Sequence, residues 1–220
     1  GVAINVVEKG SFTISTAGDE PLKRAGPLSA IVFAVPIALV GFEESATWII
    51  IIQCGMLFGA GLLARALASP YGANKNVLQV ILIFNPSLIS LAHHAQSDLL
   101  FMFLITLFLF LLVGLLRESG GWNVGRLISI GIVAGLLPLA RPLGLYYIMV
   151  MPIIVLVAMG IKGQSTKISW KVVVSGLLMS SLIAVIVVTP WGLRNKTVLG
   201  EFALTHSEGL MMEWHYNALQ

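Results

Sequence analysis

The sequence predicts an all-α integral membrane protein, a polytopic bundle of about six transmembrane helices. Hydrophobic residues make up 57% of the chain and charged residues 10%, whereas soluble domains carry about 25% charge. The mean hydropathy is +0.94. Several apolar runs approach or exceed the roughly 18–20 residues that cross a bilayer as a helix. A helix satisfies its own backbone polar groups in lipid, so the spans should be helical.

Six apolar runs are predicted as membrane spans, with charged residues and helix breakers in most of the connections between them. These runs cover residues 47–66, 76–93, 97–116, 126–140, 143–161 and 170–190. The fourth and fifth are joined by a tight turn at Arg141-Pro142, because proline cannot continue helical hydrogen bonding. We therefore expect a helix bundle over 47–190. An outward-facing loop and juxtamembrane segment should precede it at 1–46, and the start of an outward-facing loop should follow it at 191–220.

A shorter apolar run at 27–42 leaves two alternatives open. It contains Pro27 and Pro36, and it is short for the hydrocarbon core of a bilayer. Treated as a full span, it would place the N-terminal segment on the inner side. Treated as a juxtamembrane or re-entrant helix, which we favour because Pro36 would kink it, it leaves both ends of the chain outside.

Alternating the six spans sorts the charged residues onto two sides. One side holds seven basic residues and one acid: Arg65, Lys75, Arg117, Arg126, Lys162, Lys167, Lys171 and Glu118. The other side holds the remaining six basic residues and nine acids, among them Asp98. Orientation follows the number of Lys and Arg residues on each side, and the side with more is cytoplasmic. That count favours the first side by only seven to six. We expect the chain in the cell inner or plasma membrane, with Asp98 and residues 189–220 facing outward.

The stretch "HHAQSDLLF" at 93–101 is the first candidate site. Polar residues at or inside a membrane are costly, so each calls for a functional hypothesis. Asp98 could simply favour the start of the next helix, where carboxylates are stabilised. Alternatively, Asp98, His93 and His94 form a polar site at the membrane surface. A divalent metal could bind there, although neighbouring histidines do not share one face of a helix.

Three arginines are candidates to bind a phosphate. Arg141 and Arg194 lie at the outer ends of two spans, and Arg24 precedes the apolar run at 27–42. Each could be a headgroup anchor or, in the case of Arg24, part of a solvated loop. A guanidinium fork is equally suited to recognising a specific phosphate. Trp191 is either an interfacial aromatic residue or, like the polar Asn195, part of the same site.

The order of four motifs resembles the polytopic GT-C glycosyltransferases, which include protein O-mannosyltransferases and the lipid A aminoarabinose transferase. These motifs are "KRAGPLSAIVFAVPIALVGFEE", "NPSLISLAHHAQSDLLFMF", "GLLPLARPLGLYY" and "TPWGLRNKTVLGEFALTHSEGL". They are similar to that family's arginine-proline stretch before a short helix, its second outward acid, its Gly-Leu-x-x-Leu-x-Arg-Pro signature and its Pro-Trp-x-x-Arg-Asn element. The resemblance runs across nearly the whole chain.

This resemblance implies transfer of a sugar from a polyprenyl-phosphate donor to an acceptor on the outward membrane face. Asp98 matches the second outward acid, while Arg141 and Arg194, with Arg24, would neutralise the departing phosphate. "GVAINVVEKGSF" looks like the tail of the stretch that follows the family's main catalytic base. The resemblance therefore places that aspartate upstream of residue 1 and implies a chain truncated at both ends.

Two other functions remain open. The chain could be a non-catalytic membrane subunit of a larger complex, interacting with partner subunits, which would account for the missing aspartate. It could also be a transporter or flippase, but its mid-membrane stretches carry almost no ionisable residues, unlike transporter sites. No nucleic-acid-binding signature and no phosphate-cradling glycine loop occur in the sequence.

Overall fold

The computed structural model describes residues 2–13, 21–22, 26–69, 74–117, 123–162, 170–202 and 204. Over these residues the chain is helical, apart from one isolated β-bridge between Thr13 and Pro21. The helices are α1 Val2–Lys9, α2 Leu28–Val40, α3 Phe42–Ala68, α4 Lys75–Ile83, α5 Pro86–Ala92, α6 Asp98–Arg117, α7 Val124–Ala140, α8 Gly144–Lys162 and α9 Trp170–Leu199. The predicted all-α class is confirmed.

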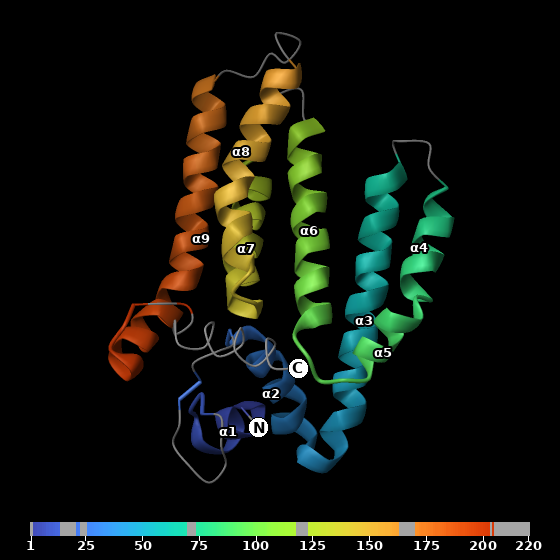
Figure 1. The fold of residues 1–220 in the computed structure, drawn as a ribbon, viewed down its shortest axis with the longest axis vertical. Coiled ribbons are helices and arrows are strands. Elements are labelled where there is room, and N and C mark those ends of the chain that lie inside the picture. Colours follow the sequence, from blue (N-terminus) through green and yellow to red (C-terminus); the bar gives the residue numbers. More distant parts are fainter. Residues whose placement is uncertain are drawn as a thin grey trace, which may run out of the picture.

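The long helices lie side by side and run in alternating directions, and α1 and α2 gather at one end of the bundle (Figure 1). We call this end the α2 end. The start of α6, the end of α7 and the end of α9 lie there too. The opposite end carries the end of α3, the start of α4, the end of α6 and the start of α7. This alternation brings the described members of the two charge groups, as sorted from the sequence, to opposite ends of the bundle.

Three helices are long and apolar enough to cross a membrane: α3, α6 and residues Lys171–Leu199 of α9. A fourth span results if α4 and α5 are counted together. Several long apolar helices therefore mark an integral membrane protein, but by this measure the described residues give three or four spans, fewer than the expected six. The difference lies in α7, which has 17 residues, and in α8, whose apolar described part covers Gly144–Val155.

Helix α7 is short because both of its ends are fixed by the local sequence. The side chain of Asn123 caps its start by accepting a hydrogen bond from the Arg126 N–H at 3.2 Å. At the other end Arg141 adopts an extended conformation, with φ −147° and ψ 142°. Residues before proline are biased toward this region, and Pro142 follows. The predicted turn at Arg141-Pro142 is thus present.

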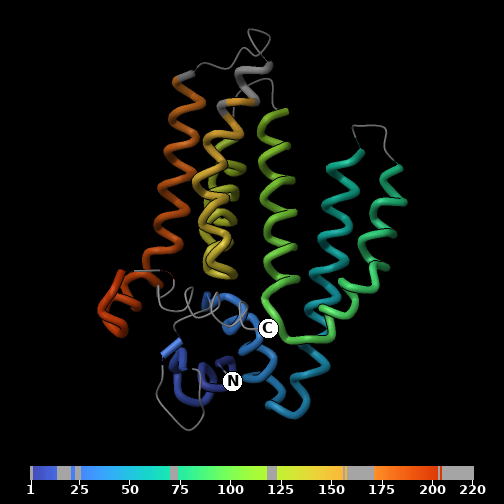
Figure 2. Tube along the Cα trace, in the orientation of Figure 1, coloured from blue at the N-terminus to red at the C-terminus, as the bar shows by residue number. Residues whose placement is uncertain are grey.

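The expected span at 76–93 is a bent pair of helices, because the chain breaks between α4 and α5 and bends by 50°. Figure 2 shows this change of direction. The Asn85 side chain accepts hydrogen bonds from the N–H groups of Ser87 and Leu88, at 2.9 and 3.3 Å. Pro86 then occupies the first turn of α5. An asparagine cap followed by proline starts a new helix.

Helix α9 also differs from expectation, since it continues through Pro190 to Leu199 instead of ending near residue 190. Its last turns, red in Figure 1, point in a new direction. A proline inside a helix removes one backbone hydrogen bond and bends the axis without always ending the helix. Gly200, at φ +80°, provides the left-handed residue that terminates it.

The run at 27–42 forms the 13-residue helix α2, with Pro36 inside it. Gly41, at φ 83° and ψ 168°, joins it directly to α3. A helix of this length reaches about 20 Å, less than the bilayer core. Figure 1 shows α2 beside α1 at the end of the bundle, which is the arrangement of a juxtamembrane helix.

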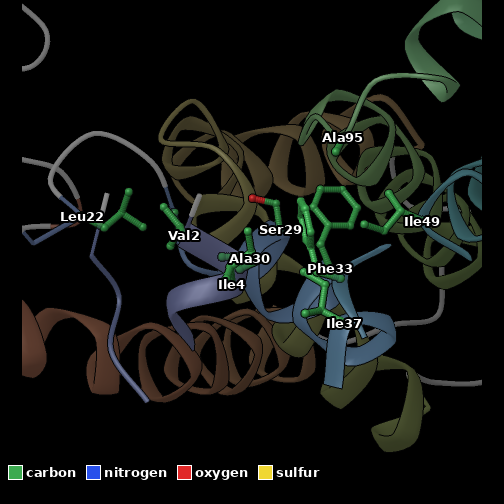
Figure 3. Close-up of a pocket in the computed structure, with 12 residues that line it drawn as sticks. Val2, Ile4, Leu22, Ser29, Ala30, Phe33, Ile37, Ile49 and Ala95 are labelled. Carbon is green, nitrogen blue, oxygen red and sulfur yellow. The ribbon is translucent and has the colours of Figure 1, made fainter. Parts of the chain in front are cut away.

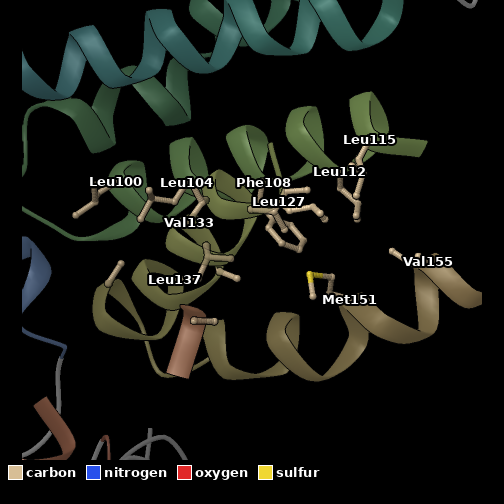
Figure 4. Packing of buried hydrophobic residues seen from close by; sticks show 14 of the residues in the cluster. Leu100, Leu104, Phe108, Leu112, Leu115, Leu127, Val133, Leu137, Met151 and Val155 are labelled. Atoms are coloured by element: carbon tan, nitrogen blue, oxygen red, sulfur yellow. The ribbon is translucent and has the colours of Figure 1, made fainter. Parts of the chain in front are cut away.

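The main core cluster is formed by α6, α7, α8 and α9 (Figure 4). Helix α6 contributes one buried stripe with helical spacing: Leu100, Leu104, Phe108, Leu112 and Leu115. Residues at such spacing share one helix face, and they meet buried side chains of α7 and α8, including Leu137 and Met151. This packing fixes the start of α6 relative to the end of α7, where two candidate site residues lie.

Candidate functional site

The two candidate residues Asp98 and Arg141 form an ion pair at the α2 end. Arg141 Nη1 donates to Asp98 Oδ1. Asp98 is the first residue of α6, and Arg141 directly follows α7, where its N–H bonds to the Leu137 carbonyl at 2.9 Å. Their side chains are 33% and 39% exposed, so an approaching anion or hydroxyl group can reach both.

This pairing changes what each residue offers chemically. One oxygen of the Asp98 carboxylate is bound by the guanidinium, while the guanidinium carries five N–H donors in all. An incoming phosphate can therefore bind Arg141 alongside the carboxylate or in its place. The sequence predicted that both residues lie on one side of the membrane; their direct contact is a structural finding.

The candidate histidines lie at the end of α5, next to this pair in sequence. The Nδ1 atoms of His93 and His94 lie 2.8 and 2.9 Å from the carbonyl oxygens of Ile89 and Ser90. A carbonyl only accepts hydrogen bonds, so each Nδ1 carries the proton and each Nε2 is a possible acceptor or ligand. Both residues are exposed. Within the described ranges, no three His, Cys, Asp or Glu side chains gather as metal ligands.

Gln53 is a polar residue of this region that the sequence interpretation missed. It lies in the middle of α3, only 1% exposed, and its Nε2 donates to the His94 carbonyl at 2.7 Å. It thereby fixes the loop between α5 and α6 that leads to Asp98. The sequence signal was a single amide inside the apolar run "WIIIIQCGML". A buried amide needs a hydrogen-bond partner, so this position predicts a polar contact with another segment.

Arg194, the second candidate for phosphate binding, is bound to the protein itself. Its Nη2 donates to the Phe12 carbonyl at 3.1 Å, and its Nη1 donates to the Leu22 carbonyl at 3.3 Å and to Asn195 Oδ1 at 2.9 Å. The guanidinium carbon also lies 4.7 Å from the centroid of the Trp191 ring, within the range of a cation–π contact. Arg194 thus ties the N-terminal segment to α9.

The neighbours of Arg194 belong to a small packed cluster. Trp191 is 7% exposed and clusters with Leu22 and Leu139, and Phe12 meets its ring edge-on at 5.2 Å between centroids. Asn195 is 1% exposed. Trp191 and Asn195 are therefore buried packing residues rather than members of an open site. Arg24 lies outside the described residues.

Two cavities have lining residues that are close in sequence to Asp98 or Arg141. The first, of about 360 Å³, lies between α1, α2, the start of α3 and the loop before α6 (Figure 3). Its lining is mostly apolar and includes Val2, Ile4, Phe33, Ile37, Ile49 and Ala95, with Ser29 as a polar member. Ala95 lies three residues before Asp98, so this cavity approaches the ion pair through the loop.

The second cavity, also of about 360 Å³, is an apolar groove between α6 and α8. It is lined by Phe101, Phe108, Leu109, Leu143, Tyr146, Tyr147, Val150 and Ile154. Phe101 is one helical turn after Asp98, and Leu143 is two residues after Arg141. Tyr147 contacts Phe101 and Phe108 edge-on, at 6.2 and 6.4 Å between centroids. One end of the groove is therefore lined by residues within one helical turn of each member of the ion pair.

No protein-family model, curated protein or solved structure matches this chain.

Proposed function

We propose that this chain is a membrane glycosyltransferase that moves a sugar from a polyprenyl-phosphate donor to an acceptor on the outward membrane face. The observation that supports this best is the Asp98–Arg141 pair at the start of the apolar α6–α8 groove. An isoprenoid phosphate has the same two parts, an anionic head and a long apolar tail. The order of sequence motifs that resemble GT-C enzymes supports the same function. In this proposal α7 and α8 also cross the membrane, which completes six spans.

The groups have distinct roles in the transfer. The acceptor oxygen forms a bond to the anomeric carbon of the sugar, and the bond from that carbon to the phosphate oxygen breaks. The acceptor proton passes to a carboxylate base, and Asp98 is the acid that we propose for the catalytic site. Arg141 stabilises the charge that develops on the leaving phosphate, as preorganised cations do in such transition states.

The Arg194 contacts change its part in this proposal. Its bonds to Phe12 and Leu22 make it a positioning residue that holds the N-terminal segment near the site. The phosphate-binding role then rests on Arg141, whose side chain is 39% exposed. Arg194 would support catalysis by fixing the N-terminal segment against α9.

A non-catalytic membrane subunit is the second candidate, and a specific observation favours it. Asp98 and Arg141 bind each other, and Arg194 and Asn195 are bound within the fold. Polar contacts of this kind are sufficient to orient helices and do not require a catalytic role. In that case the protein would still assemble with partner subunits but would not transfer a sugar.

The test uses the full-length protein in detergent or proteoliposomes. Polyprenyl phosphate should bind more tightly than the uncharged polyprenol, and Arg141→Gln should remove that difference. A panel of labelled polyprenyl-phosphate sugars then tests transfer, which Arg141→Gln and Asp98→Asn should each reduce by about 100-fold. Lys196→Gln, an exposed charge change at the same end, should leave both unchanged.

The outcomes separate the two candidates. Binding of polyprenyl phosphate without transfer of any sugar in the panel would favour the non-catalytic subunit. Full transfer by Asp98→Asn would remove Asp98 from the site. Equal binding of polyprenyl phosphate and polyprenol by the unmodified protein would overturn the proposed function.

A further inference from the structure

A second polar feature lies at the end of the bundle opposite the candidate site. A groove of about 280 Å³ opens between α3 and α4. It is lined by Leu62, Arg65, Ala66, Ser69 and Lys75, and we call it the basic groove. The α3 residues recur at intervals of three and four, so they share one face of that helix.

The basic groove has a fixed cation on one wall. Arg65 is half-buried, and its Nη1 donates to Gln79 Oε1 at 3.3 Å. Lys75 lies one turn before Gln79 and therefore on the same face of α4. A Cβ atom at Gly61 would lie 2.9 Å from Ile83 Cγ1, which shows how closely α3 and α4 approach just below the groove. The two helices thus hold both cations at one opening.

The charge around the basic groove is uniformly positive over the described residues. The acids whose positions are described, Glu8, Glu43, Glu44, Asp98 and Glu201, belong to the α2 end. The opposite end carries Arg65, Lys75, Arg117, Arg126 and Lys171. Basic residues grouped beside membrane helices attract anionic headgroups, at about 1 kcal/mol per cation.

The lining also has an apolar part that a free anion would not use. Leu62 is 43% exposed and lies with Ala66 beside the two cations. Leu62 is one turn further into the apolar part of α3 than Arg65, whereas Ser69, one turn beyond Arg65, adds a hydroxyl donor. The polar and apolar surfaces follow one another along the helix, as the head and tail of a lipid do.

We propose that the basic groove binds the phosphate headgroup of an anionic membrane phospholipid. Arg65 and Lys75 contact the phosphate, Ser69 donates a hydrogen bond to it, and the first part of an acyl chain packs on Leu62 and Ala66. This site is separate from the Asp98–Arg141 pair and is independent of the sugar-transfer function.

The test titrates the delipidated full-length protein with phosphatidylglycerol, phosphatidylcholine or inorganic phosphate, and measures bound lipid by native mass spectrometry. Phosphatidylglycerol should bind more tightly than the zwitterionic lipid. Lys75→Gln should weaken phosphatidylglycerol binding about fivefold, the equivalent of one cation at a membrane surface. Arg65→Gln should do the same, and Lys171→Gln, at the same end but outside the groove, should not.

The two variants also separate a loss of charge in the groove from a change in helix packing. Arg65→Gln removes the bond to Gln79, whereas Lys75→Gln leaves it intact, so a shared loss of lipid binding points to charge in the groove. Equal affinity for the two lipids, or unchanged binding by Lys75→Gln, would overturn the proposal. Thermal stabilisation by inorganic phosphate equal to that by phosphatidylglycerol would also overturn it, because it would identify a site for the free anion.

Discussion

The Arg194 side chain joins parts of the chain that are far apart in sequence. Its carbonyl partners, in Phe12 and Leu22, are 182 and 172 residues away. A guanidinium can donate to two carbonyls at once through its rigid fork, whereas the ammonium group of lysine is a compact point charge. The identity of this residue, and not only its charge, should therefore matter for the N-terminal segment.

Arg194→Lys should loosen that segment while keeping the net charge. We expect faster amide hydrogen exchange over residues 11–13 and at Leu22, and a loss of about 1–3 kcal/mol in the free energy of unfolding. Hydrogen exchange with mass spectrometry measures the first, and denaturant unfolding in micelles the second. Lys196→Gln, two residues further along α9 and exposed, is the control. Unchanged exchange in Arg194→Lys would show that these bonds do not secure the segment.

Sequence reasoning about single residues succeeded where charge or helix position was enough. Asp98 could be predicted at the start of a helix, and Arg141 at a turn on the same side, because the spans and Pro142 fix both positions. The partners of Arg194 could not be predicted, since a backbone carbonyl has no signature in the sequence. The same holds for Trp191, whose indole N–H donates to the Leu204 carbonyl at 3.2 Å.

At the scale of elements, α7 and α9 approach each other closely. Cβ atoms placed at Gly131 and Gly135 would lie 2.7 Å from the Ser180 carbonyl oxygen and 2.8 Å from the Ala184 carbonyl oxygen. Two glycines four residues apart allow backbones of membrane helices to approach closely. The buried Ser180 hydroxyl also donates to the Leu127 carbonyl at 3.0 Å, across the same interface.

Gly135→Ala should therefore push α7 and α9 apart. We expect a loss of about 1–3 kcal/mol in the free energy of unfolding, typical of overpacking, measured by denaturant titration in mixed micelles. Gly55→Ala is the matched control: Gly55 and Gly59 on α3 have the same spacing, but a Cβ at Gly55 would meet nothing within 4 Å. That change should be neutral or stabilising, since alanine favours helix. Equal losses in the two variants would contradict the assigned interface.

The boundaries of the elements show why helix prediction from apolar runs was incomplete. Asn85-Pro86 is a start signal for a helix, but it lies inside a long, mainly apolar run, and hydropathy alone does not detect it. Pro190 had the opposite effect, because it was interpreted as a helix end although the helix continues to Leu199. The Asn85 cap therefore sets the start of α5, whereas Pro190 does not set the end of α9.

At the scale of the whole molecule, the charge distribution predicted more than any single motif. Sorting charged residues by alternating spans separated two groups, and the bundle brings these groups to its two ends (Figure 1). The separation of charges holds although α7 and α8 are short as spans, because the directions of the two helices still alternate. The short helix α2 lies beside α1 at one end of the bundle, and the side of the membrane on which α1 lies depends on whether α2 crosses it.

Membrane topology provides the test of this arrangement. In a Cys54→Ser background, single cysteines are introduced at three exposed positions, Glu8, Gln96 and Asn123, and intact cells are treated with an impermeant maleimide. Glu8→Cys and Gln96→Cys should be labelled from outside, because both lie at the α2 end, and Asn123→Cys only after permeabilisation. Labelling of Glu8→Cys and Gln96→Cys from opposite sides would mean that α2 crosses the membrane. Labelling of Asn123→Cys alone from outside would reverse the orientation inferred from the charges, because the basic end of the bundle would then face outward.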